Sequence, residues 1–289
     1  MRLPPFELHA PRTVEEATAL LERYGDDAAL YGGGTELLLL MKLGFAEPGH
    51  LVDVKGIEEL AGLRAEDRLL SVGATTTHRE LERSPAVRER WPALAEMERG
   101  VANLRVRHAG TLGGNLCFAD PHSDPATFLL AADAVLVCRR GGGTARRVPV
   151  GEFVAGPYRT ALGPGELLVS VEVPASPPGS AMAHRKLAFH ERPAATVACL
   201  ARLESGRVAE ARVAVGSVGV VPVRAAEAER LLVGLEAAAP DGGALERAGI
   251  AAAEAARAVE DANGSVEYKE NLVRVLVKRT FAEALAGAR

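Results

Sequence analysis

The sequence predicts an α+β protein of two or three packed subdomains, of which the last is a separate α+β domain. Its 289 residues are too many for one small core. Helix and strand patterns alternate in the first part of the chain. After a proline-, serine- and glycine-rich segment, the pattern changes to a strand hairpin followed by helices. We therefore expect subdomains at residues 1–56 and 57–174, a linker at 175–180 and a C-terminal domain at 181–289.

The first subdomain is expected to begin with a helix. Thr13 and Glu16 have the spacing of a capping box, in which each side chain accepts a hydrogen bond from a backbone N–H group. An apolar helical face continues to Tyr24. The elements expected next are a strand at residues 28–31, a glycine-rich segment at 32–36, a short helix up to residue 42 and a strand at 50–54.

The second subdomain contains another capping box, at Thr77 and Glu80, which predicts the start of a helix. Pro92 suits the first position of a further helix that runs towards Val101. The other elements expected here are a strand at residues 69–73, a glycine-rich segment at 110–115, a helix at 128–132, strands at 134–138 and 167–173, and a flexible turn at 141–143.

The C-terminal domain is expected to open with antiparallel strands. Two apolar runs, at residues 196–203 and 208–215, are joined through Ser205 and Gly206, which is a hairpin signal. Three alanine-rich helical stretches follow, the last at residues 268–285. This part of the chain therefore predicts an antiparallel sheet packed with helices.

Composition excludes several classes of protein. The formal net charge is −4 and no long basic stripe occurs, which argues against nucleic acid as a partner. No apolar run approaches the length of about 18 residues that spans a bilayer, and residues 1–12 lack the apolar core of a secretory signal. Three widely spaced cysteines favour a reducing cytoplasm, and no metal-ligand spacing is present. An iron–sulfur cluster would need four thiolates.

The two glycine-rich segments are candidates for binding an anion. Glycines let the backbone approach a ligand closely and direct several N–H groups at it. Two such segments, 32–36 and 110–115, could together hold the diphosphate of one dinucleotide. Each considered singly is equally well explained as a tight turn at a strand end. Leu37 stands where a Rossmann turn has its third glycine, and no P-loop motif occurs.

The segment between the second glycine-rich stretch and the next helix is rich in polar groups. Ser123 and Asp124 could bind ligand hydroxyls, but Ser123 is as well explained as a helix cap. His122 is expected to be a loop residue. Both interpretations of Ser123 stay open on these residues alone.

Five motifs in register resemble the FAD-binding subunit of the molybdenum hydroxylases, a family that includes the carbon monoxide dehydrogenase medium chain and the flavin domain of xanthine dehydrogenase. The similarity extends over essentially the whole chain. The matching segments are 32–37 with Met41 and Lys42, 110–115 with residues 120–124, 165–168 leading to Pro174, Lys186 with Leu187, and 211–218 with 222–225 and Glu229.

This resemblance implies the two-subdomain FAD-binding fold of the vanillyl-alcohol oxidase (PCMH) type, followed by a C-terminal domain of the carbon monoxide dehydrogenase flavoprotein type. Ala102 and Val106 would lie near the adenine, Asp124 would bind FAD hydroxyls, Leu168 would pack near the isoalloxazine, and Lys186 would favour the reduced flavin. The other implied FAD contacts are Leu30, Tyr31, Gly32, Gly33, Gly34, Thr35, Glu36, Leu37, Gly110, Thr111, Gly113, Gly114, Asn115, Cys117 and Ser123.

The chain also departs from the family pattern. Many relatives have an aspartate and a tyrosine shortly after the Lys-Leu motif, whereas this chain has Arg-Pro-Ala-Ala at residues 192–195. The flavin would therefore be shielded differently or be more open. No counterpart of a flavin-linking histidine is evident, so non-covalent FAD is expected.

The resemblance implies electron transfer within a complex, with no catalytic residue on this chain. A molybdopterin large subunit would oxidise the substrate, and an iron–sulfur small subunit would pass electrons to the FAD, in a dimer of heterotrimers. One alternative is a single-chain FAD-dependent oxidoreductase, which would need an acid or base such as His184 or His190, although both are better explained as strand residues. The other is a non-catalytic assembly protein without cofactor.

Overall fold

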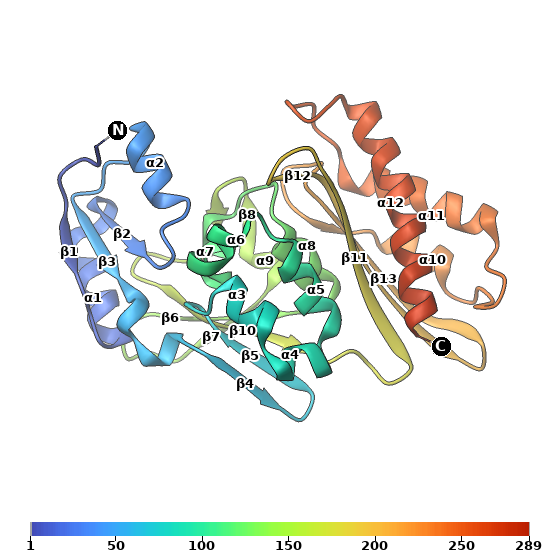
Figure 1. Cartoon of the computed structure of the whole chain (residues 1–289), viewed down its shortest axis with the longest axis horizontal. Coiled ribbons are helices and arrows are strands. Elements are labelled where there is room, and N and C mark those ends of the chain that lie inside the picture. The colour runs from blue at the N-terminus through green and yellow to red at the C-terminus, as the bar shows by residue number, and fades with distance from the viewer. Residues whose placement is uncertain (1, 289) are drawn as a thin grey trace.

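The computed structural model describes residues 2–288, which form three sheet-centred parts in a row (Figure 1). The first part is a three-stranded parallel sheet with strand order β1-β3-β2. Thr13 caps the first helix by accepting a hydrogen bond from the Glu16 N–H group, as predicted. The elements are β1 (Glu7–His9), α1 (Val14–Tyr24), β2 (Ala28–Tyr31), α2 (Leu37–Leu43) and β3 (His50–Asp53).

The second part is a five-stranded antiparallel sheet covered by short helices, with strand order β4-β5-β10-β6-β7. The strands are β4 (Leu63–Glu66), β5 (Leu69–Gly73), β6 (Val135–Arg139), β7 (Arg146–Pro149) and β10 (Leu167–Pro174), with the small pair β8 (Val154–Gly156) and β9 (Arg159–Thr160). The helices are α3 (His78–Arg83), α4 (Pro85–Arg90), α5 (Pro92–Gly100), α6 (Leu104–Ala109), α7 (Leu112–Phe118), α8 (Asp124–Ala131) and α9 (Val150–Phe153).

The third part is a four-stranded antiparallel sheet with three helices, which confirms the predicted architecture of this region. The boundary that we place at residues 175–180 covers the segment between β10 and β11 and the first residue of β11. The strands are β11 (Ser180–Ala188), β12 (Pro193–Glu204), β13 (Arg207–Gly216) and β14 (Val223–Arg224), and the helices are α10 (Ala226–Leu232), α11 (Gly242–Ala256) and α12 (Val266–Gly287).

Strand β12 is covered on both faces, which joins the second and third parts. Successive side chains of a strand point to opposite faces. Val197 and Cys199 belong to the core under α11 and α12, whereas Ala198 belongs to the core of the second part, next to α8. The first nine residues of β12 are buried, which explains why its sequence is a continuous apolar run rather than an alternating one.

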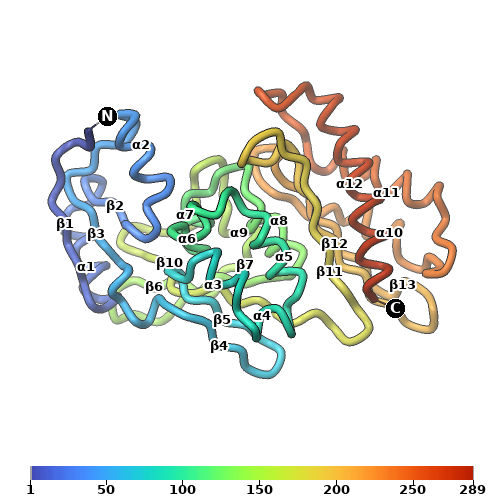
Figure 2. The backbone as a smooth tube through the Cα atoms, in the orientation of Figure 1, coloured from blue at the N-terminus to red at the C-terminus, as the bar shows by residue number. Residues whose placement is uncertain are grey.

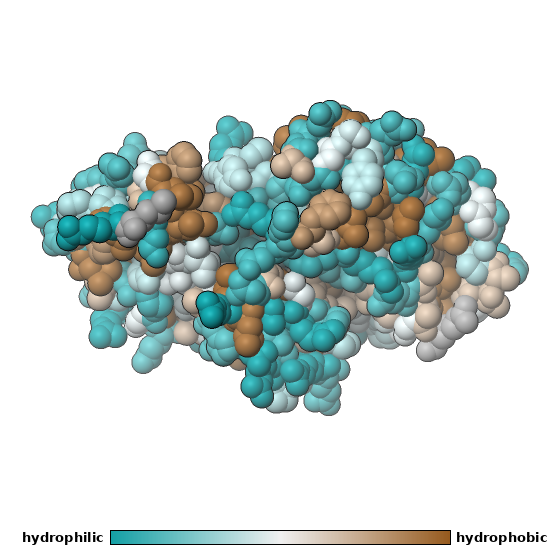
Figure 3. Space-filling view, turned by 45° about the horizontal axis from the view of Figure 1, so that its top comes forward, coloured by the Kyte–Doolittle hydropathy of each residue, from teal (hydrophilic) through white to brown (hydrophobic). Residues whose placement is uncertain are grey.

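The chain runs from one end of the molecule to the other, so that the N-terminal strands and the C-terminal helices lie far apart (Figure 2). Apolar surface gathers at the N-terminal end, where the second helix, α2, exposes Leu39 and Leu43 (Figure 3). No helix among residues 2–288 is long and apolar enough to cross a membrane.

Candidate functional site

The first glycine-rich segment leads from β2 into α2 and presents unused hydrogen-bond donors. The N–H groups of Gly33, Gly34 and Thr35 donate no hydrogen bond to any of residues 2–288. Tyr31, at the end of β2, packs beneath the segment, because a Cβ on Gly34 would lie 2.3 Å from its ring. Free donors of this kind are suited to an anionic ligand such as a diphosphate.

The second glycine-rich segment is mostly helix rather than a turn, which corrects the turn interpretation. Gly110 ends α6, and Thr111 caps α7, accepting a hydrogen bond from the Gly114 N–H group at 3.0 Å. The Leu112 and Gly113 N–H groups donate to backbone carbonyls of the loop between β5 and α3. A Cβ on Gly113 would lie 2.5 Å from the Ala74 oxygen, so this glycine is required for close packing. Most of the free donors therefore come from the first segment.

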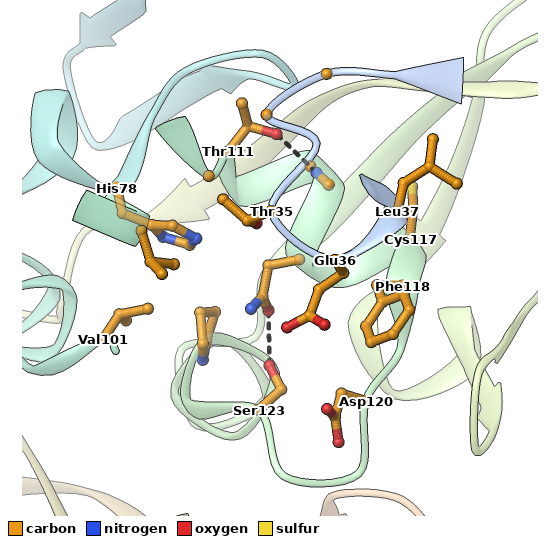
Figure 4. A pocket seen from close by; sticks show the side chains of 18 of the residues that line it. Thr35, Glu36, Leu37, His78, Val101, Thr111, Cys117, Phe118, Asp120 and Ser123 are labelled. Atoms are coloured by element: carbon orange, nitrogen blue, oxygen red, sulfur yellow. Dashed lines mark hydrogen bonds between the residues drawn. The ribbon is translucent and has the colours of Figure 1, made fainter. Parts of the chain in front are cut away.

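The two segments meet in space, as the diphosphate hypothesis requires. A Cβ on Gly33 would lie 2.1 Å from the Ala109 carbonyl oxygen and 2.7 Å from the Gly110 Cα atom. A Cβ on Gly32 would be 3.5 Å from the Thr111 Oγ1 atom. Figure 4 shows Thr35 and Thr111 on these two segments beside one pocket. Chain segments almost eighty residues apart therefore form one wall.

A cleft of about 330 Å³ opens beside these segments, a volume typical of small-molecule sites. Tyr31 and Lys186 are the two predicted FAD contacts that do not line it. The predicted contacts that line it are Leu30, Gly32, Gly33, Gly34, Thr35, Glu36, Leu37, Ala102, Val106, Gly110, Thr111, Gly113, Gly114, Asn115, Cys117, Ser123, Asp124 and Leu168.

Ser123 occupies the cap position of α8 but makes no capping hydrogen bond. Its hydroxyl donates instead to the Asn115 Oδ1 atom at 2.6 Å, which joins α7 to the start of α8 across the cleft floor (Figure 4). The capping interpretation is therefore wrong. His122, just before it, lies in a turn, as predicted.

Asp124 is a buried carboxyl group at the edge of the cleft. Its Oδ2 atom lies 2.6 Å from the Lys186 Nζ atom, which also donates to the Gly100 carbonyl oxygen at 2.8 Å. Its Oδ1 atom has no hydrogen-bond partner among residues 2–288. Burial raises the pKa of Asp124 to about 6, although the Lys186 charge lowers it. Lys186 thus neutralises Asp124, and its contact with a flavin stays a prediction.

Two groups of cleft residues were missed at the sequence level. His78 points into the pocket (Figure 4), and its Nδ1 atom is 2.6 Å from the Glu98 Oε2 atom, which is fully buried. Arg192 lies at the cleft and forms ion pairs with Glu36 at 2.9 Å and with Asp120 at 3.2 Å. The helix start at Thr77 could have indicated His78, whereas no local signal indicates the partners of Arg192.

Cys117 lines the cleft as a neutral thiol. Burial raises its pKa to about 12, so it carries no charge at physiological pH. Burial likewise raises the pKa of Cys138 to about 11. Neither group is therefore poised as a nucleophile.

Comparison with known proteins identifies the group to which this architecture belongs. The family model "FAD binding domain in molybdopterin dehydrogenase" matches residues 4–176, and "CO dehydrogenase flavoprotein C-terminal domain" matches residues 183–284. The carbon monoxide dehydrogenase medium chain of Hydrogenophaga pseudoflava is 36% identical over 98% of both chains. The 6-hydroxypseudooxynicotine dehydrogenase complex subunit alpha of Paenarthrobacter nicotinovorans is 32% identical over 100% of this chain and 97% of its own.

Solved structures agree with these sequence matches. Carbon monoxide dehydrogenase from Hydrogenophaga pseudoflava superposes with a TM-score of 0.94 at 36% identity, over 100% of this chain and 99% of the other. Quinoline 2-oxidoreductase from Pseudomonas putida 86 gives a TM-score of 0.93 at 29% identity, over 100% and 99%. The chain therefore belongs to the FAD-binding medium subunits of the molybdopterin-dependent dehydrogenases, the family of the carbon monoxide dehydrogenase medium chains.

Proposed function

We propose that this chain receives electrons from iron–sulfur clusters on a small partner subunit and passes them, through non-covalent FAD, to an external acceptor. One observation supports this proposal above all: residues 32–36 and residues 110–115 lie in contact and line the same cleft. Substrate oxidation would take place on a molybdopterin large subunit. The relatives named above are subunits of dehydrogenases of this kind.

The residues of the cleft fit a dinucleotide. The free N–H groups of Gly33, Gly34 and Thr35 suit a diphosphate, and glycine at position 33 leaves no side chain between the two segments. Asp124 also lines the cleft, and a carboxylate at this position suits a ligand hydroxyl. FAD, when bound, supplies the two-electron redox chemistry.

The chain's own residues would bind and orient this cofactor. Ala102 and Val106 offer apolar contacts for the adenine, and Leu168 offers one for the isoalloxazine. Lys186 keeps Asp124 in place through the ion pair at 2.6 Å. Arg192 bridges the rim of the cleft, because it forms ion pairs with Glu36 on one side and Asp120 on the other.

The single-chain oxidoreductase is the second candidate, and one observation favours it. His78 lines the cleft and is held by Glu98, so an acid–base group is available there. His184, considered earlier, is an unsuitable base, because burial lowers its pKa to about 3. His190 lies in an exposed bend after β11.

The exposed apolar face of α2 supports the proposal of a partner subunit. Leu39 and Leu43 lie four residues apart on one side of the helix, and Phe45 follows with 78% of its surface exposed. Large apolar side chains grouped on a surface mark interaction sites. We propose that the small subunit, the large subunit and this chain form a dimer of heterotrimers in the cytoplasm.

Affinity purification of the tagged chain from its native cells tests this proposal. The expected product contains two further polypeptides, iron, molybdenum and about one FAD per chain, released by acid because it is non-covalent. Flavin without iron or molybdenum would support the single-chain enzyme instead. A preparation without flavin, even after incubation with FAD, would support the assembly protein.

Reduction kinetics then separate the two enzymatic functions. The purified FAD-loaded chain should remain oxidised with organic substrates of the complex, whereas the complete complex should bleach the flavin absorbance. Reduction of the isolated chain by substrate would contradict the proposed role. In that case the variant His78→Gln would identify whether the His78–Glu98 pair is responsible.

A further inference from the structure

A second cluster of potential ligand groups lies at the far end of the N-terminal sheet from the FAD cleft. Glu7 and His9 lie on strand β1, and His50 begins strand β3. Residues 7 and 50 are paired in the parallel register, and residues 7 and 9 project from the same face of their strand. The cluster sits at the amino ends of β2 and β3, whereas the glycine-rich segment 32–36 follows the carboxyl end of β2.

The distances within this cluster resemble those between the ligands of one metal ion. The His9 Nε2 and His50 Nδ1 atoms are 3.0 Å apart. Glu7 carboxylate oxygens lie 3.9 Å from the His9 Nε2 atom and 3.6 Å from the His50 Nδ1 atom. Ligand atoms about 2.1 Å from a tetrahedral Zn²⁺ are about 3.4 Å from one another. The three separations therefore bracket the value expected for zinc.

A carboxylate and an aromatic ring lie next to the imidazoles. The Asp27 Oδ2 atom lies 3.8 Å from the His50 Nε2 atom, on the far side of the ring from the cluster. The Asp27 Oδ1 atom is itself fixed, because it accepts the Gly49 N–H group at 2.8 Å. The Tyr24 ring stacks on His50 with centroids 3.6 Å apart and lies 5.2 Å from His9. A carboxylate behind a histidine ligand is the usual second layer of a zinc site.

The three side chains are also accessible to solvent. The His9 and His50 side chains are 14% and 19% exposed, and the Glu7 side chain is 65% exposed. Two imidazoles with one carboxylate form a donor set that suits Zn²⁺, with a fourth position for water. A hydrogen bond between the two histidines also accounts for the 3.0 Å distance, whereas a metal ion would engage the Glu7 carboxylate as well.

We propose that Glu7, His9 and His50 bind one Zn²⁺ ion, which ties the edge strand β1 to β3. Strand β1 has three residues and pairs with β3 alone among the described strands, so such a cross-link adds directly to its stability. The site is independent of the FAD cleft and of the proposed electron transfer. A metal site here was not expected from the sequence, since 41 positions separate the two histidines.

Calorimetric titration of zinc chloride into the untagged chain, purified with its flavin and freed of metal by a chelator, tests this site. We expect one saturable site per chain. The variants His9→Gln and His50→Gln should each weaken zinc binding at least about tenfold. Asp27→Asn, which keeps the acceptor for Gly49, should weaken it less. His190→Gln removes an exposed histidine elsewhere and should bind zinc like the wild type.

Thermal melting provides the second readout. Zinc should raise the melting temperature of the wild type and of His190→Gln, but not of His50→Gln, when each protein is compared with itself in the absence of zinc. The proposal is overturned if zinc does not saturate a site, or if both His9→Gln and His50→Gln retain wild-type affinity. If His50→Gln fails to fold, His9→Gln and Asp27→Asn still decide the question.

Discussion

At the scale of single residues, the cleft depends on two kinds of position. One is a glycine where no side chain would fit, and the other is a carboxyl group that is buried away from water. Gly33 faces backbone of the second segment at a distance that no Cβ atom tolerates. Asp124 is a carboxyl group with 4% exposure that forms an ion pair with Lys186 on strand β11. Gly33 and Asp124 therefore affect both the ligand site and the stability of the fold.

Gly33→Ala should lower both FAD content and stability. The added Cβ would lie 2.1 Å from the Ala109 carbonyl oxygen, so the two segments must separate. Overpacking of this kind costs about 1–3 kcal/mol. Flavin absorbance after gel filtration and the melting temperature provide the measurements. Gly142→Ala is the control, because its nearest atom would be 4.0 Å away. Equal flavin content in the two variants would count against the contact between the segments.

Asp124→Asn should change the pH dependence of stability. The folded-state pKa of about 6 lies above the ordinary value of 3.8, so the folded chain retains a proton that the unfolded chain releases between these values. The contribution of Asp124 to stability therefore decreases as pH rises from about 4 to about 6 and is constant above that. Its total change is on the order of 3 kcal/mol.

Melting of the flavin-free chain between pH 4.5 and 7.5 measures this effect. The stability of Asp124→Asn relative to the wild type should increase with pH through the window and then level off. Asp67→Asn alters an exposed carboxyl group in a turn and should show no such trend. Parallel pH profiles for wild type and Asp124→Asn would exclude a raised pKa.

At the scale of elements, local sequence signals determine where helices begin. Thr77 accepts the Glu80 N–H group, and the Glu80 carboxylate accepts the Thr77 N–H group at 2.7 Å. This reciprocal cap starts α3, whose first residue is His78 of the cleft. Such elements were predictable because capping involves residues three positions apart. The edge strands β1 and β14 were not predicted, because two or three residues carry no periodicity.

Thr77→Ala should destabilise the protein by about 1 kcal/mol, since the cap of α3 is lost. Urea unfolding measures this change. Thr144→Ala, in the exposed loop before β7, should stay within about 0.5 kcal/mol of the wild type. Similar losses in both variants would show that the capping box contributes nothing.

At the scale of the whole molecule, all three parts contribute to one cleft. Glu36 comes from the first part, Asp120 from the second, and Arg192 from the connection between β11 and β12 in the third. Arg192 bridges the other two by ion pairs. The C-terminal domain therefore helps to enclose the cleft and also packs against its neighbour through β12.

Arg192→Ala should accelerate FAD dissociation roughly two- to tenfold, because two partly exposed ion pairs of at most about 1 kcal/mol each are lost. Stopped-flow dilution into a flavin trap measures the rate. The difference from the wild type should shrink at high salt. Arg185 is as exposed as Arg192 and pairs with Glu283, away from the cleft lining, so Arg185→Ala should leave dissociation unchanged. An unaltered rate in Arg192→Ala would mean that the bridge does not restrain the cofactor.

By itself, the sequence determined the α+β class, the starts of α1, α3 and α5, the C-terminal hairpin and the two glycine-rich segments, because these follow from spacings of a few residues. Tertiary structure alone decided that Gly33 touches the second segment, that Glu98 holds His78, and that Arg192 spans the cleft. It also brought His9 next to His50. Strand register and domain packing bring together residues that are tens of positions apart, and in some cases more than a hundred. No local sequence pattern indicates which of these residues will be in contact.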